Sequence, residues 1–118
     1  MTLQASPAPL WKDGQDVTVD DLAEALRCGS PVVVVDVREP WEVEKAHLPE
    51  TIHIPLVQLD ERCCELPRDA RIVVHCHHGG RSACAVAWLQ EHGYVQVHNL
   101  LGGVDAWSRM VDPSVPRY

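Results

Sequence analysis

The sequence predicts an α/β protein with a mostly parallel sheet, and three observations support this prediction. Residues 31–36 and 71–75 each contain a short, continuous apolar run rich in valine and isoleucine, as expected of strands covered on both faces. Segments with a helical spacing of apolar residues lie between and after these runs. Such an alternation of strands and helices produces parallel strands joined by helical connections. A chain of 118 residues has room for one such domain.

The domain is expected to begin after an extended N-terminal segment. Residues 1–14 contain prolines and a glycine in a polar setting, which favours an extended lead-in over a helix or a strand. We place the folded domain at residues 15–118 and expect Trp11 to dock the lead-in on it.

Each element of the domain follows from a local signal. Short β-branched runs indicate five strands, at residues 17–19, 31–36, 51–54, 71–75 and 95–97. Helical spacing with capping residues indicates helices from Asp20 or Asp21 to Gly29, at residues 40–45 and 56–64, from Ser82 to Gly93, and at residues 104–110. The prolines of residues 112–116 cannot continue the last helix.

Composition narrows the class of protein. A formal net charge of −7 makes a nucleic-acid partner unexpected, because phosphate binding requires a basic face. The longest apolar run is far too short to span a bilayer, so we expect no membrane association. The first residues lack the basic and apolar regions of a signal peptide. These features indicate a cytoplasmic enzyme.

The cysteines do not form a disulfide framework. The chain has 5 of them, an odd number without regular spacing. Cys63 and Cys64 are adjacent and cannot easily pair with each other. We expect Cys84 to be a small buried residue and Cys28 to pack at a helix end. A redox role for Cys63, Cys64 or Cys84 is left open.

The stretch from residue 73 to residue 82 organises the chain. It is expected to form the end of a buried strand, a glycine loop and the first turn of a helix. Cys76 would then lie beneath a helix N-terminus, where unpaired N–H groups and the helix dipole favour a negative charge. A thiol in this position should ionise easily, and the thiolate is a nucleophile.

Two other interpretations of Cys76 compete with the nucleophile. A lone cysteine is often only a small buried residue, but this does not explain the glycines, arginine and serine that follow it. The flanking histidines suggest a metal site, yet consecutive residues rarely converge on one ion, and no second ligand pair has zinc-like spacing. We therefore predict a nucleophile and no metal.

Four segments in the same order resemble single-domain rhodanese sulfurtransferases. Residues 76–82, Cys-His-His-Gly-Gly-Arg-Ser, fit the family's loop Cys-x-x-Gly-x-Arg-Ser. Residues 36–42 resemble its Asp-Val-Arg-Glu segment, and residues 47–55 resemble its His-Ile-Pro-Gly-Ala-x-Asn-x-Pro segment. Residues 101–107 resemble its late Gly-Gly-x-x-x-Trp motif. The resemblance implies a rhodanese-like three-layer sandwich with a central, mostly parallel, five-stranded sheet.

The resemblance also implies a reaction. A sulfane sulfur from thiosulfate or a persulfide donor would pass through a persulfide on Cys76 to cyanide or a thiol acceptor, with no cofactor. The partners would be a small-molecule sulfur donor and a thiophilic acceptor, with a thioredoxin-like or other thiol protein as a candidate. The alternative is a sulfur-relay or regulatory module that a partner protein feeds and that has little activity on free thiosulfate.

A third possibility is a phosphatase or arsenate reductase. Four residues separate Cys76 from Arg81, whereas the related phosphatases carry one more. The shorter loop suits a single sulfur atom rather than a tetrahedral phosphate, so we expect sulfur chemistry.

The residues expected around Cys76 form two groups. The substrate-binding loop comprises His77, His78, Gly79, Gly80, Arg81 and Ser82. The supporting residues are Asp36 and Arg38.

Individual roles can be assigned within these groups. Both glycines can adopt positive φ and let the backbone approach the sulfur. Arg81 is either an electrostatic aid to the anion or a lock on the loop, and we favour the lock. We expect Ser82 to bond to loop backbone. In some family members the positions of the two histidines carry arginine or lysine. Histidines are only partly protonated near neutral pH, which leaves the sulfur donor open.

Neighbouring residues are expected to support the loop. Arg38 and Glu42 are spaced for an ion pair that ties a strand to a helix. We expect His75 to be a buried histidine with satisfied ring nitrogens, and Trp88 and Trp107 to anchor the core.

Overall fold

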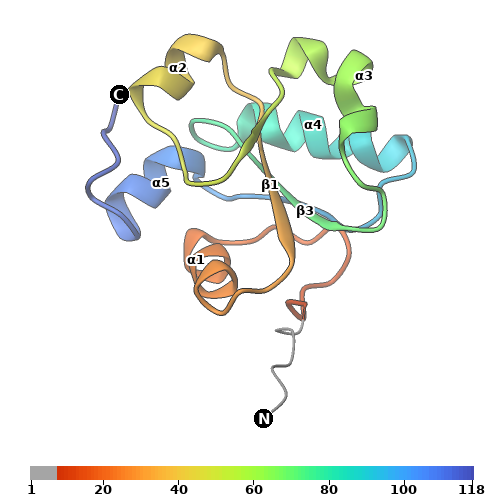
Figure 1. Cartoon of the computed structure of the whole chain (residues 1–118), viewed down its shortest axis with the longest axis horizontal. Coiled ribbons are helices and arrows are strands. Elements are labelled where there is room, and N and C mark those ends of the chain that lie inside the picture. The colour runs from red at the N-terminus through yellow and green to blue at the C-terminus, as the bar shows by residue number, and fades with distance from the viewer. Residues whose placement is uncertain (1–7) are drawn as a thin grey trace.

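Four parallel strands form the sheet in the computed structural model, which describes residues 8–118 (Figure 1). Their order is β2-β1-β3-β4, and β1 and β3 are the central pair. The strands are β1 (Val32–Asp36), β2 (Ile52–His53), β3 (Arg71–His75) and β4 (Val97–Asn99). The predicted α/β class and parallel sheet are confirmed, and the two most apolar runs occupy the centre.

The prediction of five strands is wrong. Val17 makes only an isolated parallel bridge to Leu100, and the chain then leaves the sheet to enter α1 (Val19–Arg27). Thr18 is the N-cap of α1, in place of the expected Asp20 or Asp21. Its side chain accepts the Asp21 N–H, while the Asp21 carboxylate accepts the Thr18 N–H. This capping box starts the helix immediately after Val17, so no strand can form there.

The remaining helices agree with the sequence except at one place. They are α2 (Pro40–Lys45), α3 (Leu59–Arg62), α4 (Gly80–Glu91) and α5 (Gly103–Met110). The helix expected at residues 56–64 is broken into the short 3₁₀ turn Leu56–Gln58, then α3, then a second 3₁₀ turn, Cys63–Glu65. The last strand begins at Val97 rather than Val95, which is 59% exposed.

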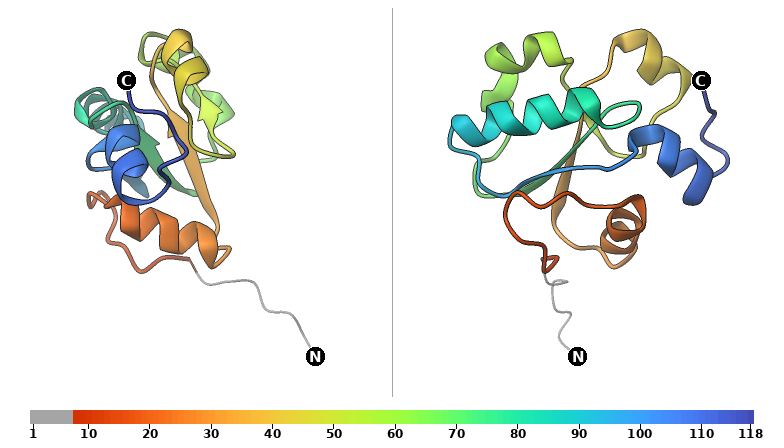
Figure 2. Two further views of the ribbon diagram at one scale, coloured as in Figure 1. Left: turned by 90° about the vertical axis from the view of Figure 1, so that its left-hand side faces the viewer. Right: turned by 180° about the vertical axis from the view of Figure 1, so that it is seen from behind.

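The helices cover both faces of the sheet. On one face, Ile72 and Val74 of β3 pack with residues of α3 and α4, such as Leu59 and Leu89. On the other face, Val73 packs with α1 and α5. Figures 1 and 2 show α1 and α5 together on their side of the sheet. This three-layer arrangement places the carboxyl ends of β1 and β3 beside the start of α4, where ligands bind in parallel α/β proteins.

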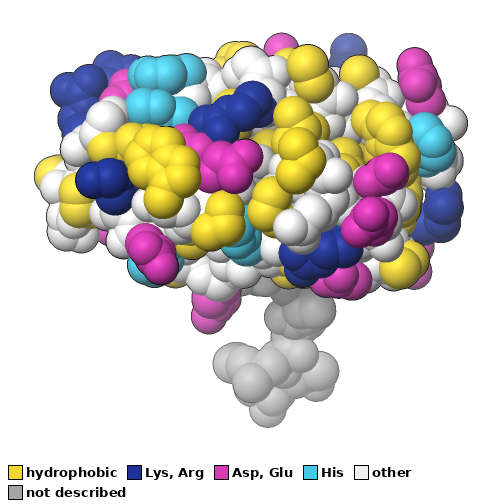
Figure 3. Space-filling view, turned by 90° about the horizontal axis from the view of Figure 1, so that it is seen from above, with side chains coloured by type: hydrophobic (Ala, Val, Ile, Leu, Met, Phe, Trp, Pro, Cys, Tyr) yellow, Lys and Arg dark blue, Asp and Glu magenta, His cyan; other side chains and the backbone are white. Residues whose placement is uncertain are grey.

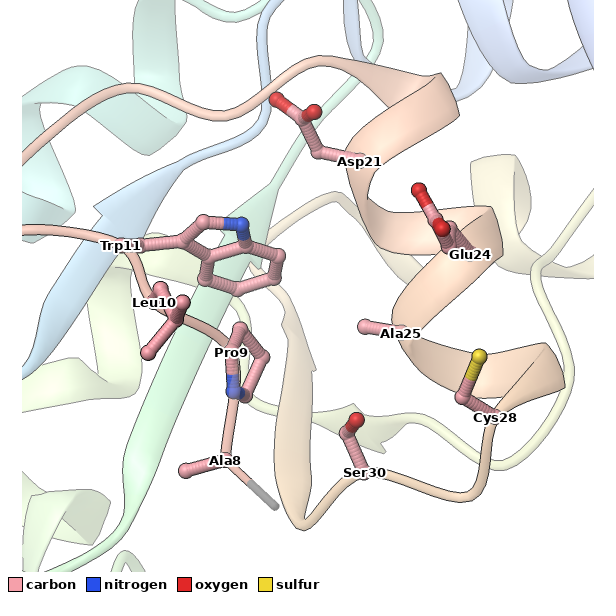
Figure 4. A pocket seen from close by; sticks show the side chains of 9 residues that line it. All are labelled: Ala8, Pro9, Leu10, Trp11, Asp21, Glu24, Ala25, Cys28 and Ser30. Carbon is pink, nitrogen blue, oxygen red and sulfur yellow. The ribbon is translucent and has the colours of Figure 1, made fainter. Parts of the chain in front are cut away.

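The predicted lead-in lies partly outside the described residues, because residues 1–7 are not described. Within the described part, Trp11 packs edge-on against the His98 ring with centroids 5.2 Å apart. A pocket of about 480 Å³ lies between residues 8–11 and α1, and Figure 4 shows side chains of both segments lining it. It shares no residue with the loop that holds Cys76. Among residues 8–118, no helix is long and apolar enough to cross a membrane.

Candidate active site

Cys76 lies directly after β3, at the centre of a tight loop that opens α4. Its Sγ is buried and accepts the backbone N–H groups of Gly79 at 3.1 Å and Ser82 at 3.4 Å. Gly79 is the N-cap of α4 and has a φ of 117°, a left-handed conformation that glycine tolerates best. The loop therefore turns its N–H groups, and the N-terminus of an α-helix, toward the sulfur.

This environment favours the thiolate. Burial opposes the ionisation of Cys76, but hydrogen bonds from the Ser82 hydroxyl and from the N–H groups of Ser82, Gly79 and His78 outweigh it. The pKa of the Cys76 thiol is therefore lowered below its ordinary value. A lowered pKa makes a cysteine a better nucleophile at neutral pH.

Asn99, at the end of β4, joins the loop and was missed by the sequence reasoning. The Ser82 Oγ lies 3.3 Å from the Cys76 Sγ and also within hydrogen-bond distance of the Asn99 Oδ1, so its single proton is shared between the sulfur and the amide oxygen. The Asn99 amide in turn donates to the Gly79 carbonyl at 3.2 Å. The one available signal was a polar residue at the end of a parallel strand, beside the end of the strand that precedes Cys76.

The N-terminus of α5 supports the loop from the other side. The N–H of Val104 donates to the Cys76 carbonyl at 2.9 Å, and the N–H of Asp105 donates to the His77 carbonyl at 3.1 Å. Gly103 makes this approach possible, because a Cβ at that position would clash with the Cys76 carbonyl oxygen and lie 2.6 Å from that of His77. The second glycine of the motif at residues 101–107 thus has a physical reason.

Arg81 ties the start of α4 to α2. Its guanidinium bonds both carboxylate oxygens of Glu42, at 2.6 and 2.8 Å. The Arg81 hydrogen bonds hold the pKa of Glu42 at about 2, and the same pair raises the pKa of Arg81. The bidentate pair orients the first turn of α4, which is the turn that faces Cys76.

The predicted ion pair between Arg38 and Glu42 is wrong. Arg38 instead pairs with Asp36, whose carboxylate accepts its Nε at 2.9 Å and its Nη2 at 2.7 Å, and both side chains are fully buried. Glu42 accepts from Arg38 only through its backbone carbonyl, at 3.4 Å, and not through its side chain. The side chain of Glu42 is occupied by Arg81, which lies far from it in sequence.

Tyr118 connects these charged groups to the loop. Its hydroxyl accepts from Arg38 at 2.8 Å and donates to Glu42 at 2.7 Å. Its ring stacks on the ring of His77, with centroids 4.0 Å apart and an angle of 6° between the planes. Burial, with the nearby His78, lowers the pKa of His77 below its ordinary value, so that His77 is largely uncharged at neutral pH.

Some expectations for neighbouring residues are wrong. Gly80 does not have a positive φ: it is the first residue of α4, and a Cβ there would meet open space. Neither ring nitrogen of His75 has a well-formed hydrogen bond, although the ring is fully buried and lies 3.8 Å from the Asp36 carboxylate. Burial lowers the pKa of His75 to about 4.

Exposure also corrects two of the packing expectations for cysteines. Cys84 faces outward from α4 and is exposed, as is Cys28 after α1. Trp107 is buried as expected, whereas Trp88 is only partly buried and stacks on His92. Within residues 8–118 no group of three or more histidine, cysteine or acidic side chains is arranged to hold a metal ion.

Comparison with known proteins identifies relatives of this arrangement. The sequence model of the rhodanese-like domain matches residues 18–110. A sulfurtransferase of Allochromatium vinosum is 34% identical over 94 residues, which cover 80% of this chain and 88% of that protein. The thiosulfate sulfurtransferase GlpE of Pseudomonas syringae is 35% identical and covers 72% of this chain, with 79% of its own length matched.

Structures and longer proteins extend the comparison. A rhodanese-related protein from Thermoplasma volcanium superposes with a TM-score of 0.73 at 32% identity, covering 86% of this chain and 95% of that one. The putative sulfur carrier protein YrkF of Bacillus subtilis is 31% identical over 79% of this chain. The chain spans only 50% of YrkF and smaller shares of several other relatives.

Proposed function

We propose that this chain, which belongs to the family of rhodanese-like domains, transfers sulfane sulfur through a persulfide on Cys76. The family contains sulfurtransferases and sulfur carriers, and the chain is a rhodanese-like protein of this kind. One observation carries the finer proposal. The Cys76 sulfur sits within 3.4 Å of two backbone N–H groups at the N-terminus of α4.

The size of the loop supports sulfur as the bound atom. Four residues separate Cys76 from Arg81, and the N–H groups of Gly79 and Ser82 both point at the single Sγ of Cys76. A persulfide adds one negatively charged sulfur to this position, which suits inward N–H groups and a helix dipole. A phosphate would require more room and more donors.

The reaction is a double displacement. The Cys76 thiolate attacks the outer sulfur of thiosulfate, the sulfur–sulfur bond of the donor breaks, and its electron pair leaves with sulfite. Cys76 then carries a persulfide anion. A thiol acceptor, as its thiolate, or cyanide attacks the outer sulfur and departs as a persulfide or as thiocyanate, which regenerates the Cys76 thiolate.

The residues around the loop would hold this geometry. Ser82, with Asn99, and the N–H of Gly79 favour the thiolate, while Arg81 and Glu42 fix the turn that presents these donors. Asp36 and Arg38 would act as support, because they are buried together where β1 ends. No step requires a metal or an organic cofactor.

A second candidate is a sulfur-relay module that receives its sulfur from a partner protein. It is favoured by His77, which is stacked on Tyr118 and largely uncharged at neutral pH, and so offers little attraction to a free dianion. A relative named as a putative sulfur carrier is consistent with this possibility. Both candidates use the persulfide on Cys76 and differ in the donor.

Steady-state kinetics with two donors separate the candidates. Thiosulfate and a low-molecular-weight persulfide should each be tested with cyanide as the acceptor, with Cys76→Ala as the control. The proposed sulfurtransferase gives multiple turnovers with thiosulfate that Cys76→Ala abolishes. Turnover with the persulfide alone would instead support the relay module. Cys76-dependent hydrolysis of an aryl phosphate would contradict both.

A further inference from the structure

Three basic side chains surround one carboxylate beside the loop. The Asp105 carboxylate accepts the Nε of Arg109 at 3.1 Å and the Nε of Arg117 at 3.0 Å. The Nδ1 of His78 lies 4.0 Å from the same carboxylate. The Asp105 side chain is 10% exposed, whereas those of Arg109, Arg117 and His78 are 48%, 61% and 68% exposed. We call Arg109 and Arg117 the arginine rim.

The arginine rim is joined to the loop of the candidate active site through Asp105. His78 is a loop residue, and the N–H of Asp105 holds the carbonyl of the preceding loop residue, His77. The face in Figure 3 shows histidine and basic side chains gathered at one end, where α2, α5 and the C-terminal segment lie in Figure 1. The arginine rim is therefore tied to the loop through Asp105.

The charges of the rim are not balanced. Burial of Asp105 raises its pKa, but hydrogen bonds from Arg117 and Arg109 outweigh this effect and hold the pKa below its ordinary value, so the carboxylate is ionised at neutral pH. One carboxylate cancels only one of the two arginine charges. By contrast, the charge of Arg81 is matched by Glu42. The arginine rim thus leaves a positive field beside the loop in a chain whose net charge is −7.

We propose that Arg109 and Arg117 are specificity-determining residues that attract a doubly charged, small sulfur donor to Cys76. The inference rests on the proposed function and concerns which class of sulfur donor the site prefers. His77 in the loop offers little charge, because its ring is stacked on Tyr118 and largely neutral. The fixed charge comes instead from α5 and from the segment that follows it.

An ordinary helix-stabilising pair does not account for this arrangement. Asp105 and Arg109 are four residues apart on α5, a spacing that by itself stabilises a helix. Arg117 is not on the helix, and it adds a second arginine to a carboxylate that is already paired. The second arginine stabilises little, because its own side chain is 61% exposed, but it adds a charge at the loop.

The test compares two donors of different charge. Thiosulfate is a dianion, whereas an aryl thiosulfonate carries the same transferable sulfur with one negative charge. The Coulomb energy is proportional to ligand charge, so the fold-change for the dianion should be the square of that for the monoanion. For the Arg109→Gln/Arg117→Gln double variant at low ionic strength, we expect KM to rise about tenfold for thiosulfate and about threefold for the thiosulfonate.

Matched variants separate charge from structure. The Arg109→Lys/Arg117→Lys double variant keeps both charges and should keep the KM for thiosulfate within about twofold, and added salt should erase the differences. Arg62→Gln removes an arginine that pairs with Glu65 on the surface of α3 and should leave both KM values unchanged. Equal fold-changes for the two donors, or failure of the lysine variant to rescue, would overturn the proposal.

A binding measurement keeps the inference separate from the proposed function. Thiosulfate binding to the Cys76→Ser variant, by isothermal titration calorimetry, should weaken about tenfold when the glutamines replace both arginines. Binding that depends on the arginines without turnover in the natural protein would refute the proposed function and keep the rim. Turnover or binding that does not depend on the arginines, or no thiosulfate binding at all, would refute the proposed role of the arginine rim.

Discussion

Two helices, α4 and α5, have their N-termini at the Cys76 loop, and the N–H groups of these two ends have different partners. Each follows a glycine with left-handed backbone, Gly79 before α4 and Gly102 before α5, and neither has a side-chain cap. At α4 the N–H groups face the sulfur of Cys76, whereas at α5 they bond to carbonyl groups of the same loop. The N-terminus of α4 can bind a charged sulfur atom, and the N-terminus of α5 holds the backbone of the loop that surrounds this atom.

The difference teaches how a short loop can turn its donors inward. A loop whose N–H groups converge must send its carbonyl groups elsewhere, and buried carbonyl groups require partners. The N–H groups of Val104 and Asp105 supply those partners. These two hydrogen bonds therefore stabilise the sulfur site although neither of them contacts the sulfur.

The largest effect is expected from Gly103→Ala, which disrupts the hydrogen bonds between the start of α5 and the loop. A Cβ at this position would clash with the carbonyl oxygens of Cys76 and His77, so the loop must shift. A shift on the order of 1 Å can cost about 100-fold in rate. We expect at least this loss in the rate of persulfide formation, measured by rapid-quench mass spectrometry.

Gly80→Ala is the matched control for this variant. A Cβ at Gly80 meets open space, and the residue is in the first turn of α4. Alanine should therefore keep the melting temperature or raise it, because alanine favours helix by about 0.5–1 kcal/mol over glycine. A larger loss of stability in Gly80→Ala than in Gly103→Ala would contradict the assigned difference between the two helix starts.

The next effect concerns the ion pair that ties the first turn of α4 to α2. Glu42→Gln leaves Arg81 without its carboxylate and should destabilise the protein by about 2 kcal/mol, between the values for exposed and fully buried pairs, because Arg81 is partly exposed. The pKa of Glu42 is lowered from 4.5 to about 2, so its contribution is present above pH 4.5 and lost as the pH falls toward 2.

Urea unfolding at several pH values checks this prediction. The difference in unfolding free energy between the natural protein and Glu42→Gln should be constant above pH 4.5 and shrink between pH 4.5 and about 2. A difference that persists unchanged at low pH would mean that the ion pair is not its source.

A smaller effect is expected from Ser82→Ala, which tests how the start of α4 stabilises the Cys76 thiolate. The variant keeps the N–H groups of Gly79 and Ser82 on the sulfur and removes only the hydroxyl. The pKa of Cys76 should rise, and alkylation by iodoacetamide at neutral pH should slow about tenfold, as expected for one lost bond to a charged group. An unchanged pH profile of alkylation would show that the hydroxyl does not act on the thiolate.

The smallest effect is expected from Tyr118→Phe. Phenylalanine keeps the ring that stacks on His77 and removes the hydroxyl that bonds to Arg38 and Glu42. We expect a loss of about 1 kcal/mol in the free energy of unfolding. Tyr118→Ala should lose more, since the stacked ring is also removed. Equal losses in the two variants would show that the stacking contributes nothing.

Local sequence patterns predict the centre of the site, but they do not predict the contacts between segments that are distant in sequence. The placement of Cys76 between a buried strand and a helix follows from the residues on either side of it, and the structure has that order. Asn99, Tyr118 and the partner of Glu42 come from segments far away in sequence, and no local signal indicates which of them meet. Their contacts depend on how the helices pack.

The errors in the fold have a similar origin. Val17 reads as the start of a strand, but the capping box of Thr18 and Asp21 begins a helix one residue later. The pairing of Arg38 was misjudged because the nearest carboxylate in helical spacing, Glu42, is taken by a residue of α4. In both cases two locally plausible interactions compete, and tertiary packing decides between them.

The most direct test of the central claim is intact-protein mass spectrometry after incubation with thiosulfate, followed by peptide mapping under non-reducing conditions. The account predicts a mass increase of one sulfur atom located on Cys76, absent in Cys76→Ala and removed by cyanide. The exposed or partly exposed cysteines, Cys28, Cys63, Cys64 and Cys84, serve as internal controls. A sulfur adduct on one of these cysteines while Cys76 stays unmodified would contradict the account.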